Sequence, residues 1–129
     1  MRIVFDSNML VSALIFPGKQ APLALDRILE GHDELLLSKP ILDELLGVLA
    51  RKFSRSREEL SRLALWLADL ATWVNPTSRI RALEDEPDNR ILECAVTGDA
   101  AQIVTGDKEL LRLGSFRGIV IATLRDYLS

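Results

Sequence analysis

Hydrophobic residues fall into two patterns along the chain, short continuous runs and longer stretches with helical spacing. Runs such as "RIVF" and "GIVIAT" are typical of strands that are buried on both faces of a parallel sheet. Apolar residues that recur every three or four positions predict amphipathic helices. The predicted strands are residues 2–6, 34–38, 102–105 and 118–123. The predicted helices are residues 8–15, 22–31, 39–53, 56–73, 87–97 and 108–113.

Capping and breaking residues mark several of these ends. Ser56 followed by Glu59 forms a capping-box pattern, which predicts the start of a long helix that runs to about Trp73. Pro17 and Gly18 are expected to stop the first helix. The inward side of the long helix is expected to carry Leu60, Leu63, Leu67 and Leu70.

Strands that alternate with helices predict an α/β fold, in which a mostly parallel sheet is covered by helices on both faces. The neighbouring helices at 39–53 and 56–73 depart from this alternation, because no strand is predicted between them. No internal repeat, low-complexity run or linker interrupts the 129 residues, so we expect one domain spanning 1–129.

Composition and charge narrow the functional classes. Apolar residues make up 48% of the chain and charged residues 27%, with a formal charge of −3, so bulk charge argues against tight non-specific nucleic-acid binding. A single cysteine, Cys94, excludes an internal disulfide and fits a reducing compartment. The longest apolar stretch, 9–16, is too short to span a bilayer. We therefore expect a cytoplasmic protein with no membrane association.

Four acidic residues occupy positions where chemistry is often found. Asp6 follows the first predicted strand, and Asp107 follows the strand at 102–105. The carboxyl ends of parallel strands are where such folds bind ligands. Asp88 begins a predicted helix, and Glu44 lies on the apolar side of another.

Each acid taken alone also has a structural explanation. Asp6 and Asp107 could cap the helices that follow them, although Ser7 or Asn8 could cap the first helix instead. Asp88 could stabilise a helix N-terminus through the helix dipole. The fourth acid could pair with a nearby basic residue.

The acids taken as a set indicate a metal site. His32 is the only histidine, and no cysteine cluster accompanies the carboxylates. An all-oxygen set of ligands suits a hard cation such as Mg²⁺ or Mn²⁺ rather than zinc. Such ions relieve the repulsion between carboxylates and activate water for attack on a phosphodiester.

Four segments of the chain resemble, in order, the acid-bearing segments of PIN-domain nucleases, of the kind found as the toxins of VapBC-type toxin–antitoxin pairs. These segments are "VFDSNMLVSALIFPG", "LSKPILDELLGVLAR", "EDEPDNRILECAV" and "IVTGDKELLRLGSFRGIVIATLRDYL". The similarity extends from residue 2 to about residue 128.

The resemblance implies a PIN fold, a three-layer α/β/α sandwich with a central, mostly parallel sheet. It implies a metal-dependent endoribonuclease that uses Mg²⁺ or Mn²⁺, with RNA as substrate, a cognate antitoxin protein as partner and a homodimeric state. The catalytic and metal-binding residues implied are Asp6, Glu44, Asp88 and Asp107. Ser7 and Thr105 would supply supporting hydroxyl groups, and Asn8 would steady the loop around Asp6.

The chain departs from the family pattern at two places. Asn89 occupies a position where related proteins often carry a further aspartate. Ala101 stands where an aspartate commonly precedes the later strand, and Asp99 lies two residues earlier. The roles of Asp85, Asn89 and Asp99 are left open by the sequence, but none of the four principal acids is missing.

A basic run, "RKFSRSR" at 51–57, has two interpretations. Its cations could contact the RNA backbone, or they could form a solvated helix end that suits the helix dipole. The RNA-binding candidates are Arg51, Lys52, Arg55 and Arg57.

Other conspicuous residues favour structural roles. Trp66 and Trp73 would share one face of the predicted long helix, so we expect them in the core or in a subunit interface rather than in a platform for base stacking. Cys94 is expected to be an inert buried thiol, and His32 a surface residue.

Rival functional classes fit less well. A haloacid-dehalogenase-type phosphatase would need an aspartate where this chain has Asn8, and a receiver domain would need a phosphoacceptor after the strand at 34–38. No glycine-rich phosphate loop is present. The remaining alternative is a catalytically silent PIN-fold module that binds RNA or protein.

Overall fold

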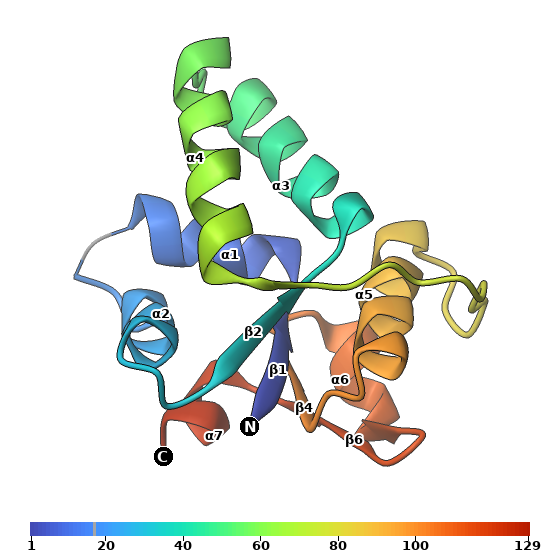
Figure 1. The fold of residues 1–129 in the computed structure, drawn as a ribbon. Helices are drawn as coiled ribbons and strands as arrows, with labels where there is room; N and C mark the ends of the chain where they lie inside the picture. Colours follow the sequence, from blue (N-terminus) through green and yellow to red (C-terminus); the bar gives the residue numbers. More distant parts are fainter. Residues whose placement is uncertain (17) are drawn as a thin grey trace.

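A central sheet of six strands, in the order β3-β2-β1-β4-β6-β5, organises the computed structural model, which describes residues 1–16 and 18–129 (Figure 1). The strands are β1 Arg2–Phe5, β2 Glu34–Leu37, β3 Thr72–Trp73, β4 Gln102–Val104, β5 Ser115–Phe116 and β6 Ile119–Ala122. The helices are α1 Ser7–Ile15, α2 Ala21–Leu29, α3 Lys39–Lys52, α4 Arg57–Leu70, α5 Glu86–Thr97, α6 Lys108–Leu113 and α7 Leu124–Leu128.

The pairing of the strands confirms the mostly parallel sheet. β1 lies in the middle and pairs in parallel with β2 and with β4, with Ile3 opposite both Leu35 and Gln102. β2 also pairs in parallel with β3, and β4 with β6, whereas β5 runs antiparallel to β6. The carboxyl ends of β1, β2 and β4 therefore meet at one edge of the sheet.

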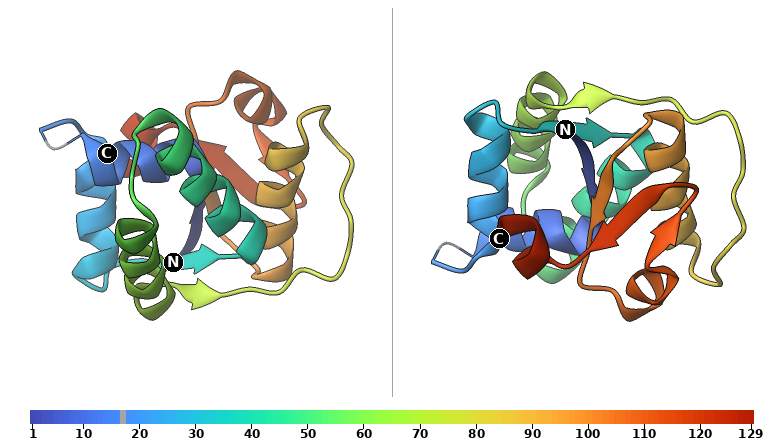
Figure 2. Two further views of the ribbon diagram at one scale, coloured as in Figure 1. Left: turned by 90° about the horizontal axis from the view of Figure 1, so that it is seen from above. Right: turned by 90° about the horizontal axis from the view of Figure 1, so that it is seen from below.

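Helices cover both faces of the sheet and confirm the three-layer α/β/α sandwich. Figure 2 shows α2 and α7 on one side of the strands and α5 on the other. α5 packs against β1, β2 and β4, while α7 contacts β6 and α2. The α3–α4 hairpin projects beyond the carboxyl edge of the sheet, and α3 also packs against α1 (Figure 1).

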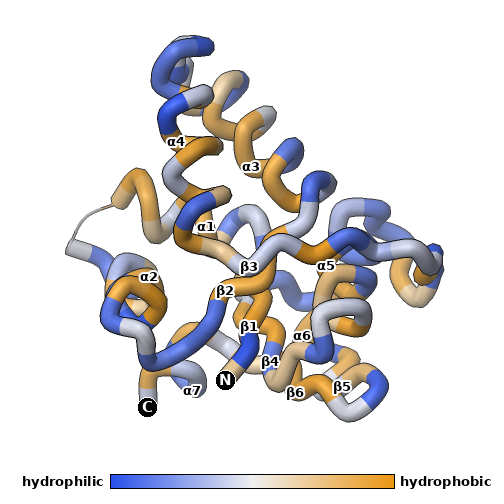
Figure 3. Tube along the Cα trace, viewed as in Figure 1, coloured by the Kyte–Doolittle hydropathy of each residue, from blue (hydrophilic) through white to orange (hydrophobic). Residues whose placement is uncertain are grey.

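The continuous apolar runs form the buried centre, as the sequence predicts. Ile3, Val4 and Phe5 of β1 are at most 1% exposed, and Ile103 of β4 is fully buried. Figure 3 shows the strands as the most continuously hydrophobic part of the trace. Burying a large aliphatic side chain is worth about 1.5–3 kcal/mol, so these strands hold their carboxyl ends firmly in place.

The long helix predicted to reach Trp73 ends earlier, at Leu70. Ala71 has extended backbone angles, and β3 pairs with Leu36 and Leu37 of β2. Trp73 therefore does not share a helix face with Trp66, and the two side chains are 41% and 40% exposed. The expectation that they lie in the core is wrong, whereas a subunit interface remains a prediction.

The sequence does not predict two other elements, because both are too short to carry a periodic pattern. These are β5, which pairs with β6, and the terminal helix α7. Pro17, predicted to stop the first helix, lies outside the described residues. Across the described chain, no helix combines the length and apolar character that a membrane crossing requires.

The expectations for Cys94 and His32 are confirmed. Cys94 is fully buried, and burial raises the pKa of its thiol to about 12, so the group is neutral and shielded. His32 is exposed and lies 3.3 Å from the carboxylate of Glu30.

Candidate active site

Asp6 stands directly after β1 and is both a helix cap and a buried carboxylate. Its Oδ1 accepts a hydrogen bond of 2.7 Å from the backbone N–H of Met9, which caps α1. Its Oδ2 accepts a hydrogen bond from the hydroxyl of Thr105, and the residue is only 5% exposed. Burial raises the pKa of the Asp6 carboxyl, against the lowering effect of these two hydrogen bonds. The capping explanation for Asp6 is therefore correct, and neither Ser7 nor Asn8 takes that place.

Thr105 connects Asp6 to Asp107. Thr105 is fully buried just after β4, and its Oγ1 accepts a 2.9 Å hydrogen bond from the backbone N–H of Asp107. The Oδ1 of Asp107 in turn accepts hydrogen bonds from the N–H groups of Glu109 and Leu110, at 2.9 and 3.1 Å. Asp107 is thus the N-cap of α6, and a single hydroxyl fixes two acid-bearing turns.

Asp88 lies in the first turn of α5, and one of its carboxylate oxygens lacks a hydrogen-bond partner within the described chain. It is 9% exposed, and its Oδ2 is buried without a hydrogen-bond partner among the described residues. Burial, followed by the negative charges of Asp107, Asp85 and Asp6, raises the pKa of the Asp88 carboxyl from 3.8 to about 7. A buried polar atom with no partner is rare in folded proteins, so this oxygen calls for an explanation.

Glu44 is half-buried in the second turn of α3. Ile41 and Val48, on the same side of the helix, are 2% and 6% exposed, so Glu44 lies along an apolar stripe as the sequence predicts. Within the described chain, Glu44 takes part in no ion pair, so the alternative in which it pairs with a nearby basic residue does not hold.

All four acids line one hollow at the carboxyl edge of the sheet. We call it the acid hollow; it has a volume of about 100 Å³, and four different segments contribute to it. Its lining comprises Asp6, Ser7, Asn8, Glu44, Asp85, Pro87, Asp88, Ile91 and Asp107. The structure therefore brings together residues that are far apart in the sequence.

A larger depression of about 470 Å³ adjoins the acid hollow, and we call it the outer hollow. The two share Asp6, Asn8 and Asp107. The rest of its lining is Met9, Ser12, Gly106, Lys108 and Glu109.

The chemistry of the acid hollow fits a hard cation. Its ionisable lining groups are all carboxylates, and the partnerless oxygen of Asp88 is one of them. Within residues 1–16 and 18–129, however, no three Asp, Glu, His or Cys side chains are arranged so that they could hold a metal ion as they stand. The carboxylates share the lining of one small hollow without forming a ready-made coordination shell.

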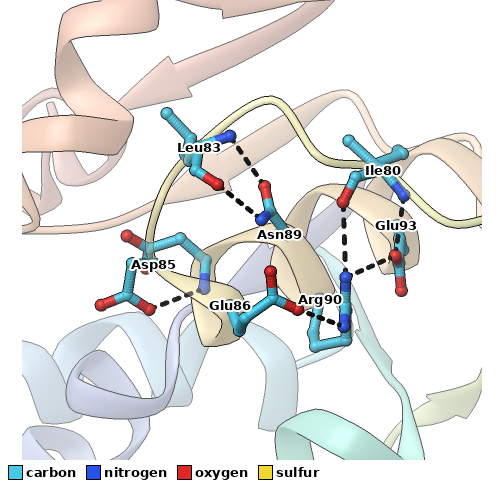
Figure 4. Close-up of polar contacts among 8 residues, drawn as sticks. Ile80, Leu83, Asp85, Glu86, Asn89, Arg90 and Glu93 are labelled. Carbon is cyan, nitrogen blue, oxygen red and sulfur yellow. Dashed lines mark hydrogen bonds and ion pairs between the residues drawn. The ribbon is translucent and has the colours of Figure 1, made fainter.

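Asn89 has a structural role that the sequence did not reveal (Figure 4). Its side-chain amide accepts a 2.9 Å hydrogen bond from the N–H of Leu83 and donates one of 2.7 Å to the same residue's carbonyl. Glu93, on the same helix, accepts a 2.9 Å hydrogen bond from the N–H of Ile80 and pairs with Arg90. These contacts fasten the irregular segment before α5, so the amide of Asn89 is already engaged.

Two further acids differ in where they lie. Asp85 is the N-cap of α5, accepting a hydrogen bond from the N–H of Asp88, and it lines the acid hollow. Its position next to an acidic helix start could have suggested both roles from the sequence. Asp99 lies before β4, at the opposite edge of the sheet from the acid hollow. Asp99 therefore does not join the other acids.

The basic run lies at the turn between α3 and α4, outside the acid hollow (Figure 1). Its four cations are exposed, and one of them, Arg55, pairs with Glu59 at 3.3 Å. Phe53, in the middle of the run, packs edge-on against Phe16 after α1, with ring centroids 5.9 Å apart. The basic run is thereby placed beside the far end of α1.

The sequence matches the PIN domain family over residues 2–109, a range that contains all four acids. The chain belongs to the PIN-domain family. The resemblance of the four acid-bearing segments to that family is thus confirmed.

Relatives of this PIN domain include the Uncharacterized protein MJ1680 of Methanocaldococcus jannaschii. The two are 29% identical over 117 residues, which cover 88% of this chain and 75% of the relative. Solved structures with a similar fold include VapBC2 from Rickettsia felis bound to a DNA fragment from its promoter (TM-score 0.69, 18% identity, 95% of this chain and 98% of that one). VapBC-1 from nontypeable Haemophilus influenzae is similar, with a TM-score of 0.68, 18% identity, and coverage of 97% of this chain and 99% of that one. These two similarities concern the fold.

Proposed function

We propose that this PIN-domain protein is a Mg²⁺- or Mn²⁺-dependent endoribonuclease and the toxin of a toxin–antitoxin pair. The observation that carries the proposal is the convergence of four acids, delivered by four segments, on the acid hollow. The residues are Asp6, Glu44, Asp88 and Asp107. Capping explains Asp6 and Asp107 as single residues, but it does not explain why Glu44 and the partnerless Asp88 line the same hollow.

The four carboxylates are the groups that would hold one or two metal ions. Oxygen donors are the ligands that Mg²⁺ and Mn²⁺ prefer, and mutual repulsion of the carboxylates favours binding of a cation. When bound, such an ion supplies a Lewis acid that activates water and stabilises charge during attack on a phosphodiester. Asp88 offers an oxygen with no partner in the described chain, and Glu44 offers a carboxylate without an ion pair.

The remaining residues of the hollows position the acids and the substrate. The hydroxyl of Thr105 and the N–H of Met9 fix both oxygens of Asp6, so this carboxylate is held in one orientation. Ser7 and Asn8 line the acid hollow and are available to hydrogen-bond the substrate. Lys108 is exposed at the outer hollow, where its ammonium group can contact a phosphate oxygen.

The partners follow from the family likeness. RNA as the substrate is supported by the resemblance of the acid-bearing segments to those of VapC-type toxins. The VapBC complexes that share the fold support a protein antitoxin as the partner. We also propose a homodimer in the cytoplasm, with the exposed Trp66 and Trp73 as candidates for its interface. A small reading frame beside the gene, whose product co-purifies with this protein and inhibits it, would support the antitoxin.

A cleavage assay tests the proposal directly. Purified protein is incubated with a panel of structured RNAs in Mg²⁺, in Mn²⁺ and in EDTA, and we expect cleavage in the two metal arms alone. Asp88→Asn should lose activity by orders of magnitude, while Asp69→Asn, at an exposed acid of α4, serves as the matched control. Equal cleavage in EDTA would refute the metal mechanism. Absence of both cleavage and metal binding would favour the silent binding module.

A further inference from the structure

A second depression, which we call the α1 recess, adjoins the outer hollow. The recess has a volume of about 400 Å³ and is lined by Met9, Ser12, Phe16, Lys19, Gln20, Ala21 and Leu124. Met9 and Ser12 line both the recess and the outer hollow, so the two lie side by side along α1. A groove therefore leads from the acids along α1 to the segment that joins α1 and α2.

Spacing along α1 explains how this groove forms. Asn8 and Ser12 are four residues apart on one face of α1, and Phe16, four residues further on, is the C-cap of the helix. Asn8 and Phe16 are exposed, and Ser12 is half-buried between them. Figure 2 shows α2 and α7 close to this part of α1, and Ala21 and Leu124 supply the remaining walls from those two helices.

Phe16 is held in place although it is exposed. Its side chain is 43% exposed, which is unusual for a large aromatic residue. Its ring packs edge-on against Phe53, and its backbone N–H donates a 3.2 Å hydrogen bond to the carbonyl of Ser12. A fixed, accessible aromatic ring is suited to stacking against a planar ligand with little loss of conformational entropy.

The recess combines three kinds of group that recognise a nucleotide. Phe16, Met9 and Leu124 provide apolar surface for a base, and Ser12 and Gln20 provide hydrogen-bonding groups. The ammonium group of Lys19 is exposed and, within the described chain, forms no ion pair. Stacking on an aromatic ring together with contact to phosphate is how single-stranded nucleic acids are bound without strict sequence preference.

We propose that the α1 recess binds one nucleoside of an RNA strand that reaches the acids through the outer hollow, with its base against Phe16 and its backbone near Lys19. This inference rests on the proposed nuclease function and adds a base-binding subsite to it. A ribose–phosphate chain in the recess can continue through the adjoining outer hollow to Asp6 and Asp107, where metal ions held by the acids would neutralise its phosphates. An apolar peptide on the same path would bring its carbonyl oxygens next to the carboxylates.

A binding assay that separates base contacts from backbone contacts tests the subsite. Fluorescein-labelled uridine and adenosine 10-mers are compared with an abasic ribose–phosphate 10-mer by anisotropy, with Ca²⁺ in place of Mg²⁺. We expect Phe16→Ala to weaken binding of both base-bearing oligomers about tenfold and to leave the abasic oligomer unchanged. Phe16→Trp should restore binding. Lys19→Gln should weaken all three oligomers and lower the salt dependence, because it contacts phosphate.

Leu65→Ala is the control, since Leu65 is 71% exposed and lines none of the three depressions. It should change none of the affinities, and thermal melts should show that all variants fold. Equal losses for base-bearing and abasic oligomers in Phe16→Ala would overturn the subsite, and so would no loss at all. If the parent cleaves RNA in Mg²⁺ while Phe16→Ala binds normally, the subsite alone fails. If the parent binds metal but no RNA, the nuclease proposal and the subsite fail together, and a peptide occupant replaces the nucleoside.

Discussion

Thr105 donates its hydroxyl hydrogen bond to Asp6, a residue 99 positions earlier in the chain. The same oxygen accepts the N–H of Asp107, so one buried side chain holds the turns after β1 and β4 together. Both turns belong to neighbouring parallel strands, whose ends meet at the acid hollow. The spacing of two of the four acids thus depends on a residue that is not itself acidic.

Replacing Thr105 with valine tests this dependence. The shape is preserved, but Asp6 loses a donor and the N–H of Asp107 loses its acceptor inside the protein. We expect the free energy of unfolding to fall by about 1–3 kcal/mol and the affinity for Mg²⁺ to fall as well. Thr105→Ser retains the hydroxyl and should stay close to the parent. Denaturant melts and Mg²⁺ titration of both variants measure this, and a valine variant that matches the parent in both would contradict it.

The effect of Asp88→Asn on the free energy of unfolding should change sign when metal is added. The buried Oδ2 has no partner in the described chain, and the nearby acids Asp6, Asp85 and Asp107 raise its energy when it is ionised. In EDTA at pH 8 we therefore expect Asp88→Asn to be more stable than the parent by about 1–3 kcal/mol. In saturating Mg²⁺ the parent should gain a linkage stabilisation that the variant largely lacks.

Thermal melts of the parent and of Asp88→Asn, with EDTA and with Mg²⁺, test this prediction. Asp69→Asn removes the same charge from an exposed site and should show the parent's full response to Mg²⁺. If Asp88→Asn is less stable than the parent in EDTA and responds equally to Mg²⁺, Asp88 is a structural residue rather than a metal ligand.

The sheet and its acid-bearing ends could be predicted because local hydrophobic runs in the sequence determine them. Four buried apolar runs define β1, β2, β4 and β6, and parallel strands must place the residues that follow β1 and β4 at one edge. By contrast, β3 has two residues, and its pairing is decided by β2 rather than by its own sequence. The apolar spacing of α4 continues by chance to Trp73, so the pattern predicts a longer helix than the structure forms.

The part of the site that could not be predicted depends on tertiary contacts. Asp6 serves as cap and as lining residue at once, although from the sequence alone the two roles are alternatives. The engagement of Asn89 with Leu83 arises because an irregular segment returns to α5. In the sequence, Phe16 is one apolar residue at a helix end, and its contact with Phe53 depends on the packing of α1 against α3.

The basic run should contribute to RNA affinity through charge. Phe53 places the run beside Phe16, so a strand that leaves the α1 recess would pass these cations. We consider the variant in which Arg51, Lys52, Arg55 and Arg57 are all replaced by glutamine. It should bind RNA more weakly, and the slope of log K against log [salt] should become shallower by roughly 0.7 for each phosphate contact that is lost. Arg55 should contribute least, since it already pairs with Glu59.

Anisotropy titrations of a single-stranded RNA across a range of KCl concentrations measure this slope. Arg117→Gln, an exposed cation on the β5–β6 turn, is the control and should leave the slope unchanged. An unaltered slope in the quadruple variant would mean that the run is a solvated helix end.

A buried ionic cluster away from the acids gives a prediction about pH. Asp33 is 8% exposed and accepts a hydrogen bond from the hydroxyl of Tyr127. It also lies 3.3 Å from Arg27, whose guanidinium group stacks over the Tyr127 ring. This cluster attaches α7, which was not predicted from the sequence, to the loop before β2.

Burial acts to raise the pKa of Asp33, but the hydrogen bond from Tyr127 and the nearby positive charges outweigh it and hold the pKa below 3.8. The folded state therefore binds the proton less readily than the unfolded state. The stabilisation is complete above pH 3.8 and is lost as the pH falls through the lower folded-state pKa.

We expect Asp33→Asn to lower the free energy of unfolding by roughly 1.5–3 kcal/mol at neutral pH, and this difference to shrink below about pH 4. Urea melts of parent and variant between pH 8 and pH 3 measure the difference, with the exposed Asp26→Asn as control. A difference that grows as the pH falls would show that the carboxylate is not stabilised by these partners.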